Sequence, residues 1–284
     1  MSNYTPAHGI SSVEVKFLIV IASVESIVGS LANLVIIIMF ITREELRRKN
    51  SDLLILNLAV ADFISLTTFL PWNTYLTSQG KGENRAYYTS LNTFCLLYSG
   101  TAVLTIAFDK YIAVVYPLRY STFISRRRTI FMISFTWLIA IGLVIYHFFN
   151  ALFSGKHHIL DKSLSGVVLL QLLFVSALYV VVFKAVRKQL LLHSVEKILI
   201  KSAFNTFILI FLFYSTFLPY AVLQMSSMND FFVWRRLFSL IYINACINPF
   251  VYFFRMKRFR RAFQKFCRNI SKRNRVLSLS RHLR

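Results

Sequence analysis

The apolar residues of this chain come in long uninterrupted blocks, and no other feature limits its fold as strongly. Seven stretches of 17–28 residues carry no Asp, Glu, Lys or Arg, except that one of them holds a single aspartate, Asp62. The stretches cover residues 26–42, 53–80, 86–108, 129–155, 163–183, 202–229 and 237–254. Because about 20 apolar residues cross the hydrocarbon core of a bilayer as a helix, the pattern predicts an integral membrane protein with seven spans.

The spans are expected to be helices, because lipid tolerates only helices and closed barrels, and these stretches far exceed the length of a barrel strand. The predicted fold class is an all-α membrane protein, a seven-transmembrane helix bundle with a short amphipathic cytoplasmic eighth helix. Pro71, Pro219 and Pro249 fall inside expected helices, where the missing N–H permits a kink. The expected helices lie near residues 15–41, 51–76, 86–116, 128–150, 163–190, 195–225 and 232–254.

The basic residues alternate between the two sides of the expected spans. The formal net charge is +22, and four segments hold 26 of the 33 Lys and Arg residues. These segments are 43–49, 110–128, 184–201 and 255–284. An excess of Lys and Arg marks the cytoplasmic side of a membrane protein. We therefore expect a multi-pass protein of the plasma membrane with its N-terminus outside, and we attribute the charge to topology rather than to a nucleic-acid partner.

The expected organisation has four regions. They are an extracellular N-terminus (1–14), a seven-transmembrane domain (15–254), an amphipathic juxtamembrane helix (255–270) and a basic cytoplasmic tail (271–284). In the amphipathic helix one face is apolar and the other is filled with Lys and Arg, which suits contact with anionic membrane lipids. The apolar face comprises Phe259, Phe263, Phe266 and Ile270.

Two covalent modifications are expected outside the spans. Asn3 lies in the tripeptide NYT, which is a glycosylation acceptor on the predicted outer side. Cys267 lies at the end of the amphipathic helix, where a cysteine is a candidate for palmitoylation, with an unmodified thiol as the alternative.

Polar residues inside the expected spans mark function by default. Asn33, Asp62, Ser99, Asn244 and Asn248 all fall near the middle of a span. A charged pair, Asp109 and Lys110, stands where the apolar block 86–108 stops. Such a pair is either a bistable element beside a cleft or a static pair at a helix end, and the residues alone leave both interpretations open.

These residues belong to motifs that resemble those of rhodopsin-like (class A) G-protein-coupled receptors. The motifs are SLANLVII around Asn33, NLAVAD ending at Asp62, FDKYIAVVYPLRY, Trp137, FLP at 217–219 and NPFVY at 248–252, with Phe259 following. They occur in the family's order and spacing in every expected helix except the fifth. The resemblance implies a receptor that, on binding an unknown extracellular ligand, activates heterotrimeric G-proteins by outward movement of its sixth helix.

The resemblance also implies roles for individual residues. Asp109 would hold Lys110 in the resting state, and Lys110 would then enter the cleft that receives the G-protein. The residues implied in this switch are Asp109, Lys110, Tyr111, Tyr179, Pro219, Asn248, Pro249 and Tyr252. A sodium ion would be held by Asp62, Ser99, Asn244 and Asn248, with a protonated Asp62 in a water network as the alternative. No other cofactor is expected, and retinal is not, because Tyr242 stands where light sensors carry the Schiff-base lysine.

Several positions depart from the family's pattern. Lys110 replaces the usual arginine, and a lysine lacks the planar fork of a guanidinium. Leu199 stands where many members carry an acid, Gln171 replaces the fifth-helix proline, and Phe217 replaces a tryptophan. Arg85 replaces the cysteine at the top of the third helix, and no outer loop offers a cysteine for a disulfide. The missing loop disulfide and the missing fifth-helix proline are together similar to melanocortin receptors, whereas NPFVYFFRMKRFRRAF is similar to adenosine receptors.

The resemblance implies a ligand pocket in the outer half of the bundle. Its residues would be Trp72, Asn92, Leu96, Phe217, Tyr220, Gln224, Trp234, Phe238 and Tyr242, which form an aromatic wall with few polar groups, although each of them could equally pack between helices. Amine receptors carry an aspartate at the position of Asn92, so a simple monoamine is not expected. Glu25 is the one acid in this half, and it is expected to hydrogen-bond to the second or seventh helix, with an orientation toward the pocket as the alternative.

Three other functions compete with that of a signalling receptor. A transporter would need a polar path and, in many folds, internal repeats, and neither is visible. An enzyme would need a nucleophile with its base or a set of metal ligands, and His147, His157, His158 and His193 show no such spacing, so no enzymatic activity is expected. A receptor-like protein with weak or no G-protein coupling remains open because of Lys110 and Phe217.

Overall fold

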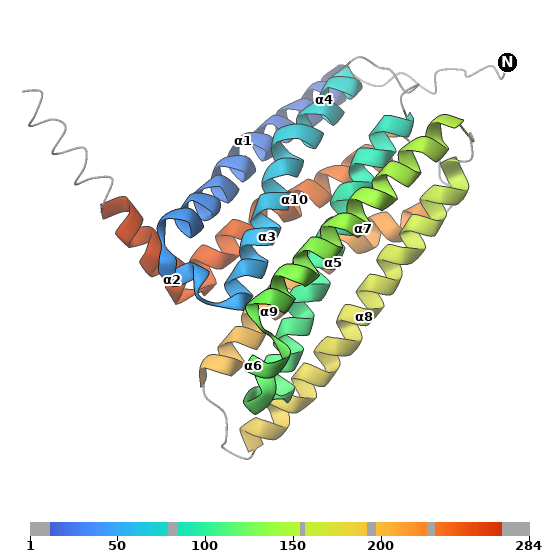
Figure 1. The fold of residues 1–284 in the computed structure, drawn as a ribbon. Coiled ribbons are helices and arrows are strands. Elements are labelled where there is room, and N and C mark those ends of the chain that lie inside the picture. Colours follow the sequence, from blue (N-terminus) through green and yellow to red (C-terminus); the bar gives the residue numbers. More distant parts are fainter. Residues whose placement is uncertain (1–11, 79–84, 154–156, 192–196, 226–230, 269–284) are drawn as a thin grey trace, which may run out of the picture.

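A bundle of long helices forms the protein (Figure 1). The computed structural model describes residues 12–78, 85–153, 157–191, 197–225 and 231–268. The long helices are α1 (Ser12–Thr42), α3 (Asn50–Ile64) continued by η1 (Ser65–Phe69) and α4 (Leu70–Ser78), α5 (Arg85–Val115), α7 (Arg126–Phe153), α8 (His157–Leu191), α9 (Lys197–Met225) and α10 (Phe231–Arg255). Short helices α2 (Glu44–Arg47), η3 (Pro117–Arg119) and α6 (Tyr120–Phe123) lie in two connections. Each of the seven expected spans is therefore a helix, and most of the expected ends lie within a few residues of the observed ones.

Length and hydropathy identify most of these helices as membrane spans. Within the described residues, five segments qualify by themselves: Val13–Thr42, Asn50–Tyr75, Arg126–Tyr146, Ser165–Lys188 and Thr206–Leu223. The span Leu97–Val115 qualifies together with Pro117–Phe123, to which it is bent by 115°. The seventh helix contributes a shorter apolar stretch, Ser239–Phe254.

The second span is interrupted where the sequence places Pro71. Proline has no N–H, so the helical ladder loses a bond there. The preceding five residues, Ser65–Phe69, form a π-helical turn in which the backbone N–H of Leu70 donates to the carbonyl of Ser65. Such a turn inserts one residue and redirects the rest of the helix. The outer part of this span, α4, thereby packs against α1.

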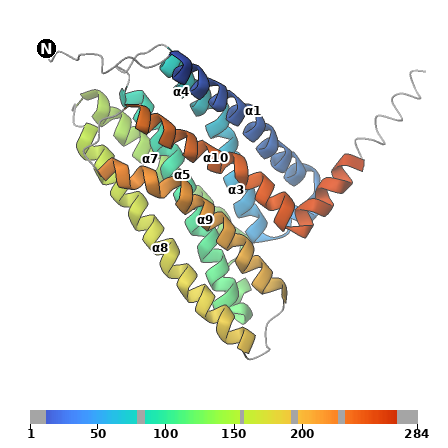
Figure 2. The same cartoon turned by 180° about the vertical axis from the view of Figure 1, so that it is seen from behind.

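Helix α5 lies at the centre of the bundle and packs against α3, α7, α8 and α9, while α1 packs against α3 and α10 (Figures 1 and 2). Four apolar clusters of described residues fill the interior. The largest includes Phe213, Phe217 and Tyr242, and the second includes Phe40 and Tyr252. The outward faces are also apolar, as expected of helices that contact lipid.

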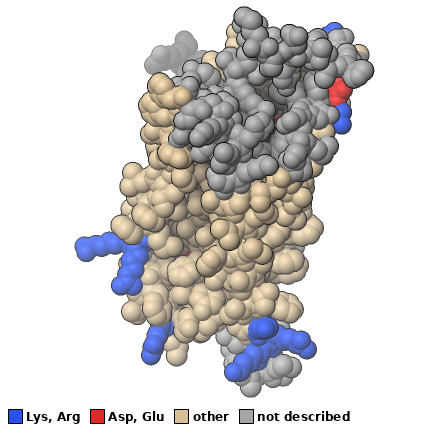
Figure 3. Space-filling model, turned by 90° about the vertical axis from the view of Figure 1, so that its right-hand side faces the viewer, with Lys and Arg blue, Asp and Glu red and all other residues tan. Residues whose placement is uncertain are grey.

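The short connections and the last helix gather at one end of the bundle, which we call the basic end. It carries α2, α6 and the helix formed by residues 257–268 (Figure 1). Figure 3 shows a broad band of uncharged side chains with most Lys and Arg beyond it, toward this end.

The helix at 257–268 is docked on the bundle by its apolar face. Phe259 is fully buried, and its ring centroid lies 5.8 Å from those of both Phe40 and Tyr252. Phe263 contacts Phe253 at 5.1 Å. The expected apolar face therefore packs on the bundle through its first half, and Ile270 lies outside the described residues.

Candidate functional site

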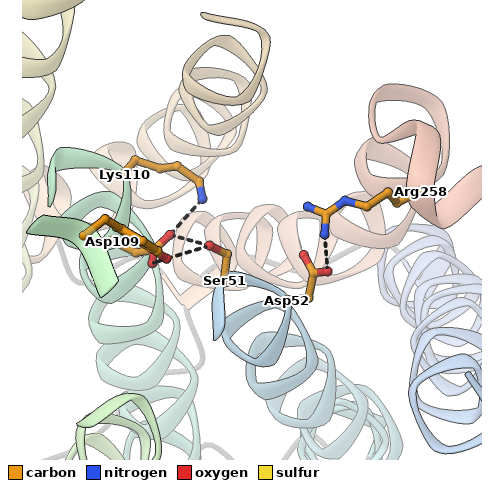
Figure 4. A network of polar contacts seen from close by, with 6 residues as sticks. Ser51, Asp52, Asp109, Lys110 and Arg258 are labelled. Carbon is orange, nitrogen blue, oxygen red and sulfur yellow. Dashed lines mark hydrogen bonds and ion pairs between the residues drawn. The ribbon is translucent and has the colours of Figure 1, made fainter. Parts of the chain in front are cut away.

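The carboxylate of Asp109 lies at the basic end, near the C-terminus of α5. The residue is only 1% exposed, and its Oδ2 lies 2.8 Å from the Nζ of Lys110 (Figure 4). The Lys110 side chain is itself largely buried. A buried ion pair is stable only when the remaining lone pairs are also satisfied.

Two hydroxyl groups complete the set of donors around this carboxylate. The Oγ of Ser51, in the first turn of α3, donates to Oδ2 at 2.9 Å. The phenol of Tyr120, in α6, donates to Oδ1 at 2.7 Å and lies 3.2 Å from the Ser51 hydroxyl. Burial raises the pKa of Tyr120, and the negative charge of Asp109 raises it further. The phenol therefore stays protonated and remains a donor at any physiological pH.

The donors are held in place by contacts between the connections. The side-chain amide of Asn50 donates to the carbonyl of Ile124 at 2.8 Å, and Arg126 donates to the carbonyl of Arg47 at 3.0 Å. The segment that follows α5 is thereby tied to the start of α3. Sequence reasoning missed Ser51 and Tyr120; the only signal for the latter was its place in the FDKYIAVVYPLRY motif.

A second ion pair lies beside the first. Asp52, next to Ser51, accepts a bond of 2.7 Å from the guanidinium of Arg258 in the helix 257–268 (Figure 4). Farther along that helix, Lys265 pairs with Glu45 of α2 at 2.7 Å, and this contact lowers the pKa of Glu45. The amphipathic helix is therefore linked by charge to the segment that also holds Asp109, a link that sequence reasoning missed.

The four residues implied in sodium binding are all buried in the middle of the bundle. The side-chain amide of Asn248 donates to Oδ2 of Asp62 at 2.8 Å. Ser99 and Asn244 form no hydrogen bond with Asp62, and the amide oxygen of Asn244 has no partner among the described residues. An unpartnered amide oxygen and a carboxylate fit a hard cation, which prefers oxygen ligands.

The remaining switch residues lie along α5, α8, α9 and α10. Tyr252 is buried, and its hydroxyl has no partner in the described part of the chain. Tyr179 contacts Phe207 across α8 and α9, and Tyr111 stacks on its neighbour Phe108 in α5. Pro219 and Pro249 lie inside α9 and α10.

Only part of the expected ligand pocket falls on described side chains. Phe217, Tyr220 and Tyr242 are buried in one apolar cluster, and the side-chain amide of Asn73 donates to the hydroxyl of Tyr242 at 3.0 Å. Trp72 is 47% exposed and contacts Tyr75. The side chains of Asn92, Leu96, Gln224, Trp234 and Phe238 lie outside the described set, as do the side chains of Leu199 and Arg85 and the whole of Asn3.

Gln171, which occupies the place of the family's helix-five proline, contacts α5 at Gly100. A Cβ on Gly100 would lie 2.1 Å from the Oε1 of Gln171, so a larger residue there would displace the end of the Gln171 side chain. The ring of Phe213 lies on the same side of this glycine. The lost proline is thus accompanied by a specific contact between α5, α8 and α9.

A comparison with known families matches residues 32–252 to the family described as "7 transmembrane receptor (rhodopsin family)". The chain belongs to this family. Members of the rhodopsin family are receptors and not enzymes, in agreement with the sequence analysis. A "D(2)-like dopamine receptor" from Takifugu rubripes is 31% identical over 114 residues, which is 38% of this chain. The match spans a quarter of that receptor's length.

Proposed function

We propose that this protein is a ligand-activated receptor that couples to heterotrimeric G-proteins through the Asp109–Lys110 pair. The observation that carries the proposal is the buried carboxylate of Asp109, with Lys110, Ser51 and Tyr120 as its donors. The Lys110 ammonium is neutralised by Asp109 in one state and can be released when a neighbouring helix moves. An ion pair of this kind is a bistable element. Two buried groups inside the bundle support the same assignment, because the amide oxygen of Asn244 and the hydroxyl of Tyr252 have no partner among the described residues and are free to take one in a second state.

The proposed activation step is an outward movement of α9 about Pro219. This movement opens the basic end beside α5 and gives Lys110 room to leave Asp109. Tyr179 and Tyr252, which lie on the helices that face the opening, then turn inward and hold the open state. The G-protein enters the cleft so formed, and its binding energy stabilises the open state.

The proposal predicts the outcome of two substitutions at this pair. Asp109→Asn removes the charge that holds Lys110 and should raise basal G-protein activation several-fold, because it favours the open state. Lys110→Arg restores the forked donor set and should preserve or increase activation. Bioluminescence measurements of G-protein dissociation in cells, at matched surface expression, test both.

Glu45→Gln is the matched control, because it neutralises an acid that is also paired with a lysine at the basic end but does not contact Asp109. Its basal signal should equal that of the unmodified receptor. A well-expressed Asp109→Asn variant with unchanged basal signalling would show that the pair is a static contact at the end of a helix.

The other features of the proposal concern location and ligand. The receptor lies in the plasma membrane with its N-terminus outside, carries a glycan on Asn3 and palmitate on Cys267, and contacts anionic lipids with its last helix. Cys267 is exposed, as an acylated thiol must be. The ligand enters between α5, α8, α9 and α10 and is not a simple monoamine, since Asn92 cannot neutralise an ammonium group.

Sodium is the second ligand of the proposed mechanism. The carboxylate of Asp62 and the oxygens of Ser99, Asn244 and Asn248 would hold it. The ion would neutralise the negative charge of Asp62, which has no cationic side chain as a partner among the described residues. It binds the closed bundle better than the open one and therefore favours the resting state.

One observation favours a second candidate, a receptor-like protein with weak coupling. Lys110 offers a single ammonium where most members of the family offer a guanidinium, and this limits bidentate contact with a partner. A ligand-library screen in cells that report cAMP, calcium and G-protein dissociation distinguishes the two. A ligand that produces a response in the unmodified receptor but not in a Lys110→Ala variant supports signalling.

A further inference from the structure

Glu25 is a carboxylate inside the bundle that the proposed mechanism does not use. It lies in the middle of α1, and the residue is 7% exposed. One turn farther along α1, Gly29 packs directly on Cys246 of α10 and on Leu66 of η1. Glu25 thus belongs to the interface of three elements, α1, η1–α4 and α10.

Neither carboxylate oxygen of Glu25 has a hydrogen-bond partner among the described residues. The expectation of a hydrogen bond to the second or seventh helix is therefore wrong. The reason is that the neighbouring polar groups are already used, because Ser26 donates to the carbonyl of Leu66 and Cys246 donates to the backbone carbonyl of Glu25. A buried acid without a donor is costly unless a charge or a proton is supplied from elsewhere.

The carboxyl group leans toward the end of the bundle opposite the basic end. Helical side chains point toward the N-terminus of their helix, and α1 and α10 run in parallel, since Glu14 pairs with Arg236 near their starts. Gly29 is level with Cys246, so Glu25, four residues earlier, is level with Tyr242. The Tyr242 hydroxyl, the Asn73 amide and the Cys95 thiol form a polar group at that level.

No described cation is in a position to neutralise this carboxylate. The segments η1 and α4 contain no ionisable side chain except Tyr75, which is exposed, and α10 presents Tyr242 and Cys246. Lys16 is exposed two to three turns before Glu25, and Arg236 is paired with Glu14. The ionisable residue that α3 contributes to the middle of the bundle is Asp62, which lies nearer the basic end and is an acid, so it cannot neutralise Glu25.

We propose that Glu25 is the anionic subsite for a positively charged group of the receptor's ligand, an ammonium or guanidinium. The group reaches Glu25 from the outer end of the bundle, between α1, α4 and α10, past Tyr242 and Asn73. This subsite lies on a different wall from the third-helix position at which amine receptors place their aspartate, so it selects cationic ligands other than simple monoamines. This inference depends on the proposed receptor function in one respect: the cationic group is assigned to the receptor's ligand.

The native thiol of Cys246 reports on this subsite without a known ligand. In a receptor carrying Cys95→Ala and Cys267→Ala, Cys246 is the one cysteine left within residues 1–284. We expect the cationic reagent trimethylammonium-ethyl methanethiosulfonate to modify it about tenfold or more faster than the anionic sulfonato-ethyl reagent, since a nearby carboxylate concentrates cations. Glu25→Gln in the same background should lower the preference to that of a simple thiol such as 2-mercaptoethanol, whose thiolate already favours the cationic reagent to some extent. Intact-mass measurement gives both rates.

Glu14→Gln is the matched control, because Glu14 is also on α1 but is already paired, and it should leave the preference unchanged. A Cys246 that neither reagent modifies, although it is modified after denaturation, would overturn the proposal and leave Glu25 as a closed, protonated acid. An equal preference with and without the Glu25 carboxylate would overturn it as well. Labelling does not depend on G-protein coupling, so a receptor that fails to signal can still pass or fail this test.

Discussion

Three of the four buried carboxylates in the described residues are stabilised to different degrees by their surroundings. Asp109 has an ammonium and two hydroxyl donors, Asp62 has a single amide donor, and Glu25 has no donor within the described residues. Removing one partner of a buried charge costs roughly 3–5 kcal/mol, whereas a complete set of partners offsets desolvation. A carboxylate with fewer donors around it depends more on an ion or a ligand from outside the protein to offset its desolvation.

Asp62 is the residue at which this dependence is easiest to measure. An ion that binds only the folded resting form stabilises that form by mass action. The stabilisation is about 2.7 kcal/mol when the ion concentration is a hundred times Kd. We expect a melting temperature several degrees higher in sodium chloride than in equimolar choline chloride. Thermal unfolding of the purified receptor, followed by thiol-reactive dye fluorescence, measures the difference.

Asp62→Asn should remove the sodium effect while the protein still folds, because asparagine retains an oxygen for Asn248. Glu44→Gln, which neutralises an exposed acid, should leave the effect intact. Equal melting of the unmodified receptor in both salts would exclude the sodium site and favour a protonated Asp62 in a water network.

At the scale of the element, the helix 257–268 is held by apolar contacts and two ion pairs of different quality. In the pair with Arg258, the Asp52 side chain is 2% exposed, whereas both members of the Lys265–Glu45 pair are more than half exposed. Exposed pairs contribute at most about 1 kcal/mol. The loss of Arg258 leaves the buried carboxylate of Asp52 uncompensated, which is more costly.

We therefore expect Arg258→Gln to weaken docking of this helix by about 1–3 kcal/mol, a range that discounts the half-exposed guanidinium. Lys265→Gln, the matched control on the same helix, should weaken docking much less, because both members of its pair are exposed. Hydrogen exchange of residues 257–268 in detergent measures both. Similar protection in the two variants would show that the apolar contacts of Phe259 and Phe263 dock the helix without help from the ion pairs.

At the scale of the whole molecule, the Lys and Arg residues are concentrated toward the basic end of the bundle. On the face that Figure 3 shows, the uncharged side chains form a wide area, and most of the visible Lys and Arg lie toward the basic end. Topology requires such an excess on the cytoplasmic side, so the excess alone does not identify a docking surface. Lys184, Arg187 and Lys188 are distinguished by their place at the end of α8, the helix that packs against both α5 and α9.

Reversal of these three residues to Glu should reduce G-protein activation by tenfold or more, on the order of 1.4 kcal/mol in coupling, because like charges would face the partner. The matched control reverses Lys257, Arg260 and Arg261, which are exposed on the last helix. Dose–response curves at equal surface expression compare the two. If both triple variants couple equally well, the charges at α8 serve topology alone.

The sequence by itself determined the seven spans, their approximate ends and the basic side, because hydropathy and charge act on each segment separately. It also identified Asp109 and Lys110, which are neighbours in the chain. Only the tertiary structure decided which groups satisfy these charges. Ser51 and Arg258 reach their partners across 58 and 206 residues, and the π-helical turn before Pro71 sets the direction of α4.

Glu25 illustrates the limit most clearly. A hydrogen bond was expected because buried polar groups usually find a partner, and the sequence contained several candidates on the second and seventh helices. In the folded bundle the Cys246 thiol donates to a backbone carbonyl instead, and the Asn73 amide donates to the Tyr242 hydroxyl. Whether a side chain is satisfied depends on all of its neighbours at once, and that information exists only when the helices have packed.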